Sequence, residues 1–117
     1  HHVHLLISNR DVVLKLAHEY DLPIRQETYL QKDFEPVYFE ELFYNQDATF
    51  EMIDTILHKD VENYELMCHP AMIDWKLYQI SSYNLRRAHE LDIICSQKAK
   101  EMTKKIELIN YQDIKKI

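Results

Sequence analysis

The sequence has 117 residues, of which 46% are hydrophobic and 29% are charged, with a formal net charge of −6 at pH 7. This length suits one domain with a working core, and the acidic balance argues against nucleic acid as a partner, which would favour a basic surface. No run reaches the roughly 20 apolar residues of a membrane span, and two cysteines are too few for a disulfide framework. We therefore expect a cytoplasmic protein that is not bound to a membrane.

The first four residues, His1-His2-Val3-His4, stand directly before the apolar run Leu5-Leu6-Ile7. If these residues form a β-strand, His2 and His4 share one face, because successive side chains point to opposite faces. Neutral imidazole is the commonest metal ligand among side chains, so this pair predicts a metal site at the start of a buried strand. The alternative is a remnant of an expression tag or a pair of structural histidines.

The chain contains no glycine, whereas about 7% is usual. Glycine normally occupies left-handed backbone positions in turns and at helix ends, so asparagine and aspartate are expected to serve there. The absence of glycine also excludes the P-loop and the G-x-G-x-x-G nucleotide-binding motif. The asparagines that we expect at such positions are Asn9, Asn45, Asn63, Asn84 and Asn110.

A helix is predicted after Ser8 or Asn9, because Val13, Leu16, Ala17 and Tyr20 follow at helical spacing. The segment 21–23 ends this helix at a proline. Residues 24–26 then read as a short strand. A strand, a helix and a strand in this order indicate a βαβ unit with a parallel sheet.

Residues 27–47 mix aromatic and acidic side chains without a clear period. A long irregular segment in a compact domain is usually functional or mobile, and an aromatic loop over a pocket at a strand end would suit a sugar. The alternative is that these rings cover the core.

Further along, Asp47 is expected to cap a helix whose apolar face holds Phe50, Ile53, Ile56 and Leu57. Residues 64–68 read as a buried strand that ends at His69-Pro70. The carboxyl end of a parallel strand is where α/β proteins place their chemistry. His69 is therefore a candidate for a catalytic role, and a structural role is the alternative.

The last third predicts a loop or short helix over 71–81, a helix after Ser81 or Ser82, a helix capped by Ser96, and a strand over 106–109. A final turn is expected to be capped by Asn110. In the second of these helices we expect Leu85, Ala88 and Leu91 to face inward. The total is about four strands and four or five helices in alternation, which predicts an α/β fold.

The residues capable of chemistry are His2 and His4 at the first strand, Arg25 at the second, and His69 with Asp74 at a later one. A metal with a separate histidine fits hydrolysis, because the metal activates water and the histidine protonates the leaving group.

Several segments, taken in this order, resemble the C-terminal half of the YdjC-like carbohydrate deacetylases, which include the chitooligosaccharide deacetylases. The most specific are the HHVHLL strand and Cys68-His69-Pro70-Ala71. The weaker ones are Leu22-Pro23-Ile24-Arg25, Phe43-Tyr44, Arg87-x-x-Glu90-Leu91 and 110–114 (NYQDI).

The resemblance implies that residues 1–117 are a single segment, the C-terminal half of a larger (β/α) barrel-like domain. It also implies a hydrolase that removes N-acetyl groups from a sugar or short oligosaccharide with a divalent metal, magnesium or zinc. His2 and His4 would line the metal site, His69 would be the catalytic acid, and Arg25, Phe43 and Tyr44 would contact the substrate.

Two departures from the family pattern affect this interpretation. The family's N-terminal Ala-Asp-Asp-Phe-Gly motif and its mid-chain histidine, which hold the metal, are absent from this chain, so the segment alone is expected to be inactive and to associate with other copies. Asn45 also replaces the glycine that usually follows Phe43-Tyr44. The competing hypothesis is a sugar-binding or structural α/β module without catalysis.

Overall fold

The computed structural model describes residues 9–117, so the predicted strand at the N-terminus lies outside the described residues. The chain divides into two compact units. Unit 1 contains the residues up to Phe39, Val61–Glu65 and Leu108–Ile117, and unit 2 contains Glu40–Asp60 and Leu66–Glu107. The prediction that residues 1–117 form a single segment of a larger domain stays a prediction.

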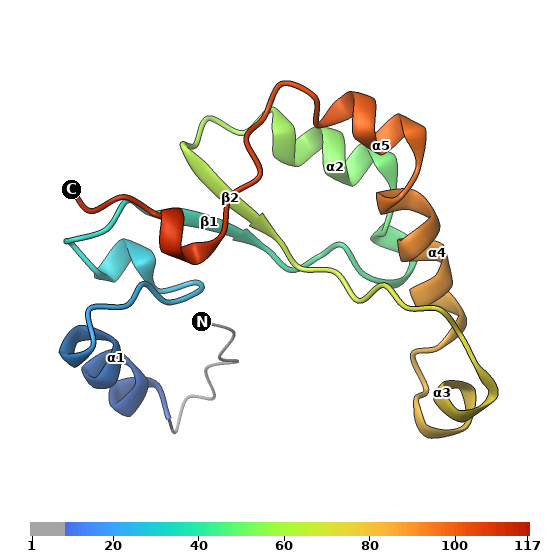
Figure 1. Ribbon diagram of the computed structural model, residues 1–117, viewed down its shortest axis with the longest axis horizontal. Helices are drawn as coiled ribbons and strands as arrows, with labels where there is room; N and C mark the ends of the chain where they lie inside the picture. Colours follow the sequence, from blue (N-terminus) through green and yellow to red (C-terminus); the bar gives the residue numbers. More distant parts are fainter. Residues whose placement is uncertain (1–8) are drawn as a thin grey trace. The chain divides into compact units, whose positions relative to one another are not determined.

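Within residues 9–117, the sheet has two neighbouring strands, β1 (Val37–Glu40) and β2 (Asn63–Leu66). They run in the same direction, and helix α2 (Phe50–Leu57) connects them (Figure 1). The backbone N–H of Met67 donates to the carbonyl of Glu40, 2.9 Å away, which continues the pairing past the end of β2. This βαβ arrangement confirms the predicted α/β class with a parallel sheet.

In unit 1, helix α1 (Arg10–Glu19) follows Asn9 as predicted. Of its predicted apolar face only Ala17 is buried, whereas Leu16 and Tyr20 are 45% and 66% exposed. The 3-10 helices η1 (Thr28–Leu30) and η3 (Tyr111–Asp113) complete the unit. Asn110 caps η3 as expected, and its backbone N–H donates in return to the Asp113 carboxylate. A small core of Phe34, Val37 and Ile114, with Tyr111 of η3 packed against it, joins β1 to the C-terminal tail.

Two predicted strands, 24–26 and 106–109, are wrong. Residues 25–27 form a turn, with Gln26 at φ 64°. The backbone N–H of Ile24 donates to the Gln31 side chain at 2.7 Å, so this N–H does not pair with a neighbouring strand. The segment 106–109, which extends from unit 2 into unit 1, also forms no strand. The tail pairs later, through an antiparallel bridge between Phe34 and Lys116.

Unit 2 is built on a core of Phe43, Ala48, Ile53 and Ile93. Its helices are α2, α3 (Trp75–Ile80), α4 (Leu85–Ile94) and α5 (Gln97–Met102), with a 3-10 helix η2 (Asn45–Asp47) before α2. Ser96 caps α5 as predicted, with its hydroxyl accepting from the Ala99 N–H at 3.0 Å. Thr49 rather than Asp47 caps α2.

The inward face of α4 differs from the prediction. Leu85 is 66% exposed and Ala88 is exposed, whereas Glu90 and Ile93 are the buried residues of this helix. The helix is rotated so that the Glu90 carboxylate reaches polar hydrogens in the interior of unit 2.

Within the described part of the chain, three residues adopt left-handed backbone angles: Asp21 (φ 55°), Gln26 (φ 64°) and Asn45 (φ 54°). Of the five asparagines expected there, only Asn45 does so among the described residues; Asn9, Asn84 and Asn110 precede helices. None of the helices within residues 9–117 combines the length and apolar character needed to cross a bilayer.

Candidate functional site

His69 follows β2 at its carboxyl end, in unit 2. Its backbone is held on both sides by α4. The N–H of His69 donates to Glu90 Oε1 at 2.8 Å, and Arg87 Nη1 donates to the His69 carbonyl at 3.2 Å. Two contacts from one helix fix the position of this residue at the strand end.

Glu90 is fully buried and organises the side chains around His69. Its Oε2 accepts a hydrogen bond of 2.5 Å from the Tyr83 hydroxyl. Its Oε1 lies 3.7 Å from Nδ1 of His69, and that nitrogen is buried without a hydrogen-bond partner. The His69 side chain is 28% exposed, so its accessible surface belongs to atoms other than Nδ1.

Two tyrosine rings enclose the imidazole. Tyr44 and Tyr83 stack on each other with centroids 4.3 Å apart and planes at 18°. The imidazole meets both edge-on, at 5.6 Å from Tyr44 and 5.8 Å from Tyr83. Tyr44 is exposed, so it offers a ring beside His69 on which a sugar face can stack.

Asn45 supplies the turn that brings this pair together. Its N–H donates to the Tyr83 hydroxyl at 2.9 Å, and its left-handed backbone is the conformation for which glycine is usually selected. Asparagine tolerates this region better than most residues. The replacement of glycine by Asn45 therefore preserves the turn.

Burial has a clear electrostatic effect in this site. It raises the pKa of the Tyr83 hydroxyl, and the hydrogen bond to Glu90 adds to that effect. It also raises the pKa of the neighbouring Cys68 thiol, with a further contribution from the charge of Glu90. Tyr83 and Cys68 therefore keep their protons at neutral pH, and Tyr83 remains a hydrogen-bond donor to the carboxylate.

The other residues expected to contact substrate are placed differently. Phe43 is fully buried in the core of unit 2, where it packs with Ala48, Ile53 and Ile93. Its side chain therefore has no surface that a sugar could reach, and the expectation for Phe43 needs correction. Asp74 caps α3 by accepting from the Leu77 N–H at 2.7 Å, which is a structural role.

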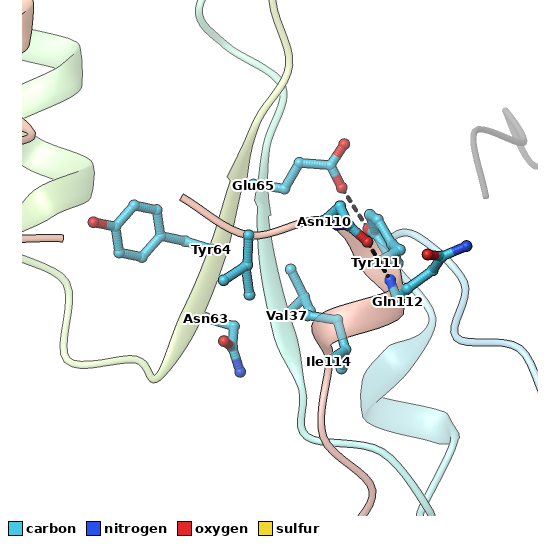
Figure 2. Close-up of a pocket in the computed structure, with 9 residues that line it drawn as sticks. Val37, Asn63, Tyr64, Glu65, Asn110, Tyr111, Gln112 and Ile114 are labelled. Atoms are coloured by element: carbon cyan, nitrogen blue, oxygen red, sulfur yellow. Dashed lines mark hydrogen bonds between the residues drawn. The ribbon is translucent and has the colours of Figure 1, made fainter. Parts of the chain in front are cut away.

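Arg25 belongs to unit 1 and is almost fully buried. Its guanidinium forms an ion pair with Glu65 and lies 4.8 Å from the centre of the Phe39 ring. Glu65 also accepts a hydrogen bond from the Tyr111 hydroxyl, and Figure 2 shows this contact on one side of β2, with Tyr64 pointing to the other. Burial and this hydrogen bond raise the pKa of Tyr111 well above its usual value.

A pocket of about 520 Å³ adjoins this buried network in unit 1 (Figure 2). Asn63, Tyr64 and Glu65 of β2 line it, together with the tail at 109–112 and Ile114. These β2 residues precede the carboxyl end of the strand, whereas α/β proteins usually bind ligands beyond that end. The residues after the strand, His69 and its neighbours, are therefore the better candidate site.

The predicted metal ligands His2 and His4 lie outside the described residues. Within residues 9–117, no group of three or more histidine, cysteine or acidic side chains is placed to hold a metal ion. The described part of the chain thus does not form a metal site by itself.

Sequence reasoning did not find the roles of Glu90, Tyr83 and Arg87. A glutamate or arginine on a helix is usually solvent-exposed, and the hydrogen bonds of these three residues span up to 38 positions of chain, from Asn45 to Tyr83. The only signal was the Arg87-x-x-Glu90 pair among the segments that resemble the deacetylase family.

The βαβ unit and the histidine beyond its second strand define an α/β protein with a site at a strand end. The family model described as YdjC-like protein matches residues 1–105, and the chain belongs to this family. It is 34% identical to a carbohydrate deacetylase of Clostridium beijerinckii, over 97% of this chain and 51% of that protein. It is 32% identical to a chitooligosaccharide deacetylase of Yersinia enterocolitica, over 96% of this chain and 47% of that protein.

The fold agrees with a crystal structure from Enterococcus faecalis, provisionally named a cellobiose-phosphate cleavage protein. The TM-score is 0.65 at 32% identity, covering 87% of this chain and 45% of the other. The chain thus spans about half the length of the relatives that it matches.

Proposed function

We propose that this chain is part of a metal-dependent carbohydrate deacetylase that removes N-acetyl groups from a chitooligosaccharide-like substrate. The observation that carries the proposal is His69, partly exposed at the carboxyl end of β2 and held by the buried Glu90. The names of the relatives from Clostridium beijerinckii and Yersinia enterocolitica support the reaction type.

In this proposal His69 acts on the leaving group. Water adds to the carbonyl carbon of the N-acetyl group, the carbon–nitrogen bond breaks, and acetate leaves. The sugar nitrogen takes the Nε2 proton of the protonated His69 imidazole. Water supplies the oxygen that acetate gains, and the proton that water loses passes to solvent, from which Nε2 is protonated again. Tyr44 stacks on the sugar ring and orients the amide toward the imidazole. Arg25 remains a candidate for substrate contact in unit 1.

The proposal retains a divalent metal, magnesium or zinc, with His2 and His4 as ligands. When bound, such an ion supplies a Lewis acid for the amide carbonyl. Because those histidines lie outside the described residues, the part played by the described residues is limited to positioning the sugar and supplying the proton.

The test is acetate release from N-acetylated chitooligosaccharide by the protein with the residues that flank this segment in its natural reading frame. Acetate release that depends on metal and stops with chelator is expected. His69→Ala should lower turnover by roughly 10²–10⁴-fold, the usual contribution of a general acid, while metal content stays the same.

His58→Ala is the matched control, because His58 is an exposed histidine of the same unit at the end of α2. It should leave turnover unchanged. Acetate release that ignores chelator, or an equal loss of metal in His69→Ala, would contradict the assigned roles. Binding of the oligosaccharide without acetate release would favour the sugar-binding module instead.

A further inference from the structure

Glu90 stands out among the described residues because its carboxylate is fully buried and close to His69. A buried carboxylate is costly unless hydrogen bonds compensate it. Two donors do so directly: the His69 backbone N–H at 2.8 Å and the Tyr83 hydroxyl at 2.5 Å. An ionised carboxylate has about four acceptor positions, so it can accept further hydrogens.

The nearest unsatisfied polar atom to Glu90 is Nδ1 of His69. It lies 3.7 Å from Oε1, which is beyond hydrogen-bond distance, and it is buried without a partner. A small rotation of the imidazole would bring a proton on Nδ1 onto Oε1. A proton on the opposite nitrogen would instead leave the lone pair of Nδ1 facing a carboxylate, which is unfavourable.

We infer that Glu90 is a positioning residue that holds the proton of neutral His69 on Nδ1, which leaves Nε2 as the nitrogen that exchanges protons with a substrate. This inference rests on the proposed function, because it gives Glu90 a role toward the proposed acid. After the protonated imidazole has donated its Nε2 proton, the remaining proton stays on Nδ1, where the carboxylate can accept a hydrogen bond from it.

The described residues that contact His69 and Glu90 support this orientation. Arg87 and Tyr83 belong to α4 and the residues before it, and both are hydrogen-bond donors, Arg87 to the His69 carbonyl and Tyr83 to Glu90. The Tyr44 ring contacts the imidazole in a T-shaped arrangement. The Cys68 thiol keeps its proton because burial raises its pKa. The carboxylate of Glu90 is thus the acceptor nearest to Nδ1.

The same chain of contacts fixes Glu90 itself. The Tyr83 hydroxyl accepts a hydrogen bond from the Asn45 N–H and donates its own hydrogen to Oε2 of Glu90. The contact with Asn45 therefore orients the hydroxyl as a donor to the carboxylate. A carboxylate held at both oxygens cannot turn away from His69 at low cost. This is the property that a positioning residue needs.

The test is the tautomer of His69, measured by long-range proton–nitrogen NMR correlation at a pH where the imidazole is neutral. In the unaltered protein, most of the neutral form should carry its proton on Nδ1. Glu90→Gln keeps the size and removes the charge. It should shift the tautomer ratio toward Nε2–H by about fivefold, as expected when a charge-assisted hydrogen bond is replaced by a neutral one.

Asp54→Asn is the matched control. Asp54 is a carboxylate 3.5 Å from Nδ1 of His58, but both side chains are exposed, at 62% and 75%. Its replacement should leave the His69 signals unchanged. An equal tautomer ratio in Glu90→Gln and in the unaltered protein would overturn the inference.

A predominance of Nε2–H in the unaltered protein would also overturn it, so the inference stays testable even if Glu90→Gln fails to fold. The measurement uses no substrate. A protein with the Nδ1–H tautomer that releases no acetate would keep the inference and reject the proposed function.

Discussion

Replacing Glu65 by leucine should destabilise unit 1 strongly, because it removes the carboxylate that compensates the buried guanidinium of Arg25. The side chains of this pair are 9% exposed at Arg25 and 17% exposed at Glu65. Removing one partner of a buried pair typically costs about 3–5 kcal/mol. The change also removes the acceptor of the Tyr111 hydroxyl, so a loss near 3–5 kcal/mol is expected against the roughly 5–15 kcal/mol that holds a domain folded.

The measurement is urea unfolding followed by circular dichroism, with the slope compared between variants to confirm the same transition. The double variant Arg25→Met with Glu65→Leu should regain most of the loss, because replacing both buried charges by apolar groups is often neutral. A double variant as unstable as the sum of the two single variants would refute the reasoning.

Asp21→Asn provides the matched control for that experiment. Asp21 pairs with Lys116 in the same unit, but the two side chains are 59% and 55% exposed. Exposed pairs contribute about 0–1 kcal/mol, and asparagine accepts the left-handed backbone of this position. If Glu65→Leu lowers the unfolding free energy no more than this control does, the Arg25–Glu65 pair is not desolvated, contrary to what the structure indicates.

Three further outcomes follow from the described contacts. The raised pKa of Tyr111 means that the folded state binds the hydroxyl proton more tightly than the unfolded state does, so this stabilisation is complete below about pH 10 and is lost above it. Tyr111→Phe should therefore flatten the decline in unfolding free energy between about pH 10 and 12. An unchanged decline would contradict this. Iodoacetamide should modify the exposed Cys95 well before Cys68, because burial raises the pKa of the Cys68 thiol. Mass spectrometry of Cys95→Ser should show that the fast adduct is missing. Equal rates of modification at the two cysteines would contradict the burial of Cys68. Ser96→Ala should lower the unfolding free energy, measured in urea, by about 0.5–2 kcal/mol, because α5 loses its cap. Replacement of the exposed Ser82 by alanine should change it by less than about 0.5 kcal/mol. Equal losses in the two variants would show that the cap is not the cause.

Local patterns in the sequence predicted the elements whose determinants are near in the chain. The helix after Asn9, the strand before His69 and the cap at Ser96 all follow from spacing and side-chain oxygens within a few residues. The segment 24–26 misled, because three residues with one apolar side chain are too few to distinguish a strand from a turn by periodicity. The Gln31 side chain, seven residues away, takes the Ile24 N–H and decides the outcome.

The candidate site was only half predictable for the same reason. His69 was recognisable from its place after an apolar strand, and Tyr44 from its place beside a resembling segment. Glu90 was not, because a carboxylate on a helix indicates a solvated face unless its partners are known. Those partners, the His69 N–H and the Tyr83 hydroxyl, come from 21 and 7 residues away and appear only in the fold.

The absence of glycine has a consequence for the unfolded chain. Every residue carries a Cβ, so the unfolded backbone samples fewer conformations and loses less entropy on folding than a chain with glycines would. The opposing contribution is backbone strain in the folded state, which among the described residues arises at the three left-handed positions. Such a position costs about 1–2 kcal/mol for a residue with a side chain. Gln26 lacks the short side chain that eases this conformation for Asp21 and Asn45. It is therefore the turn at which a single glycine would relieve the most strain.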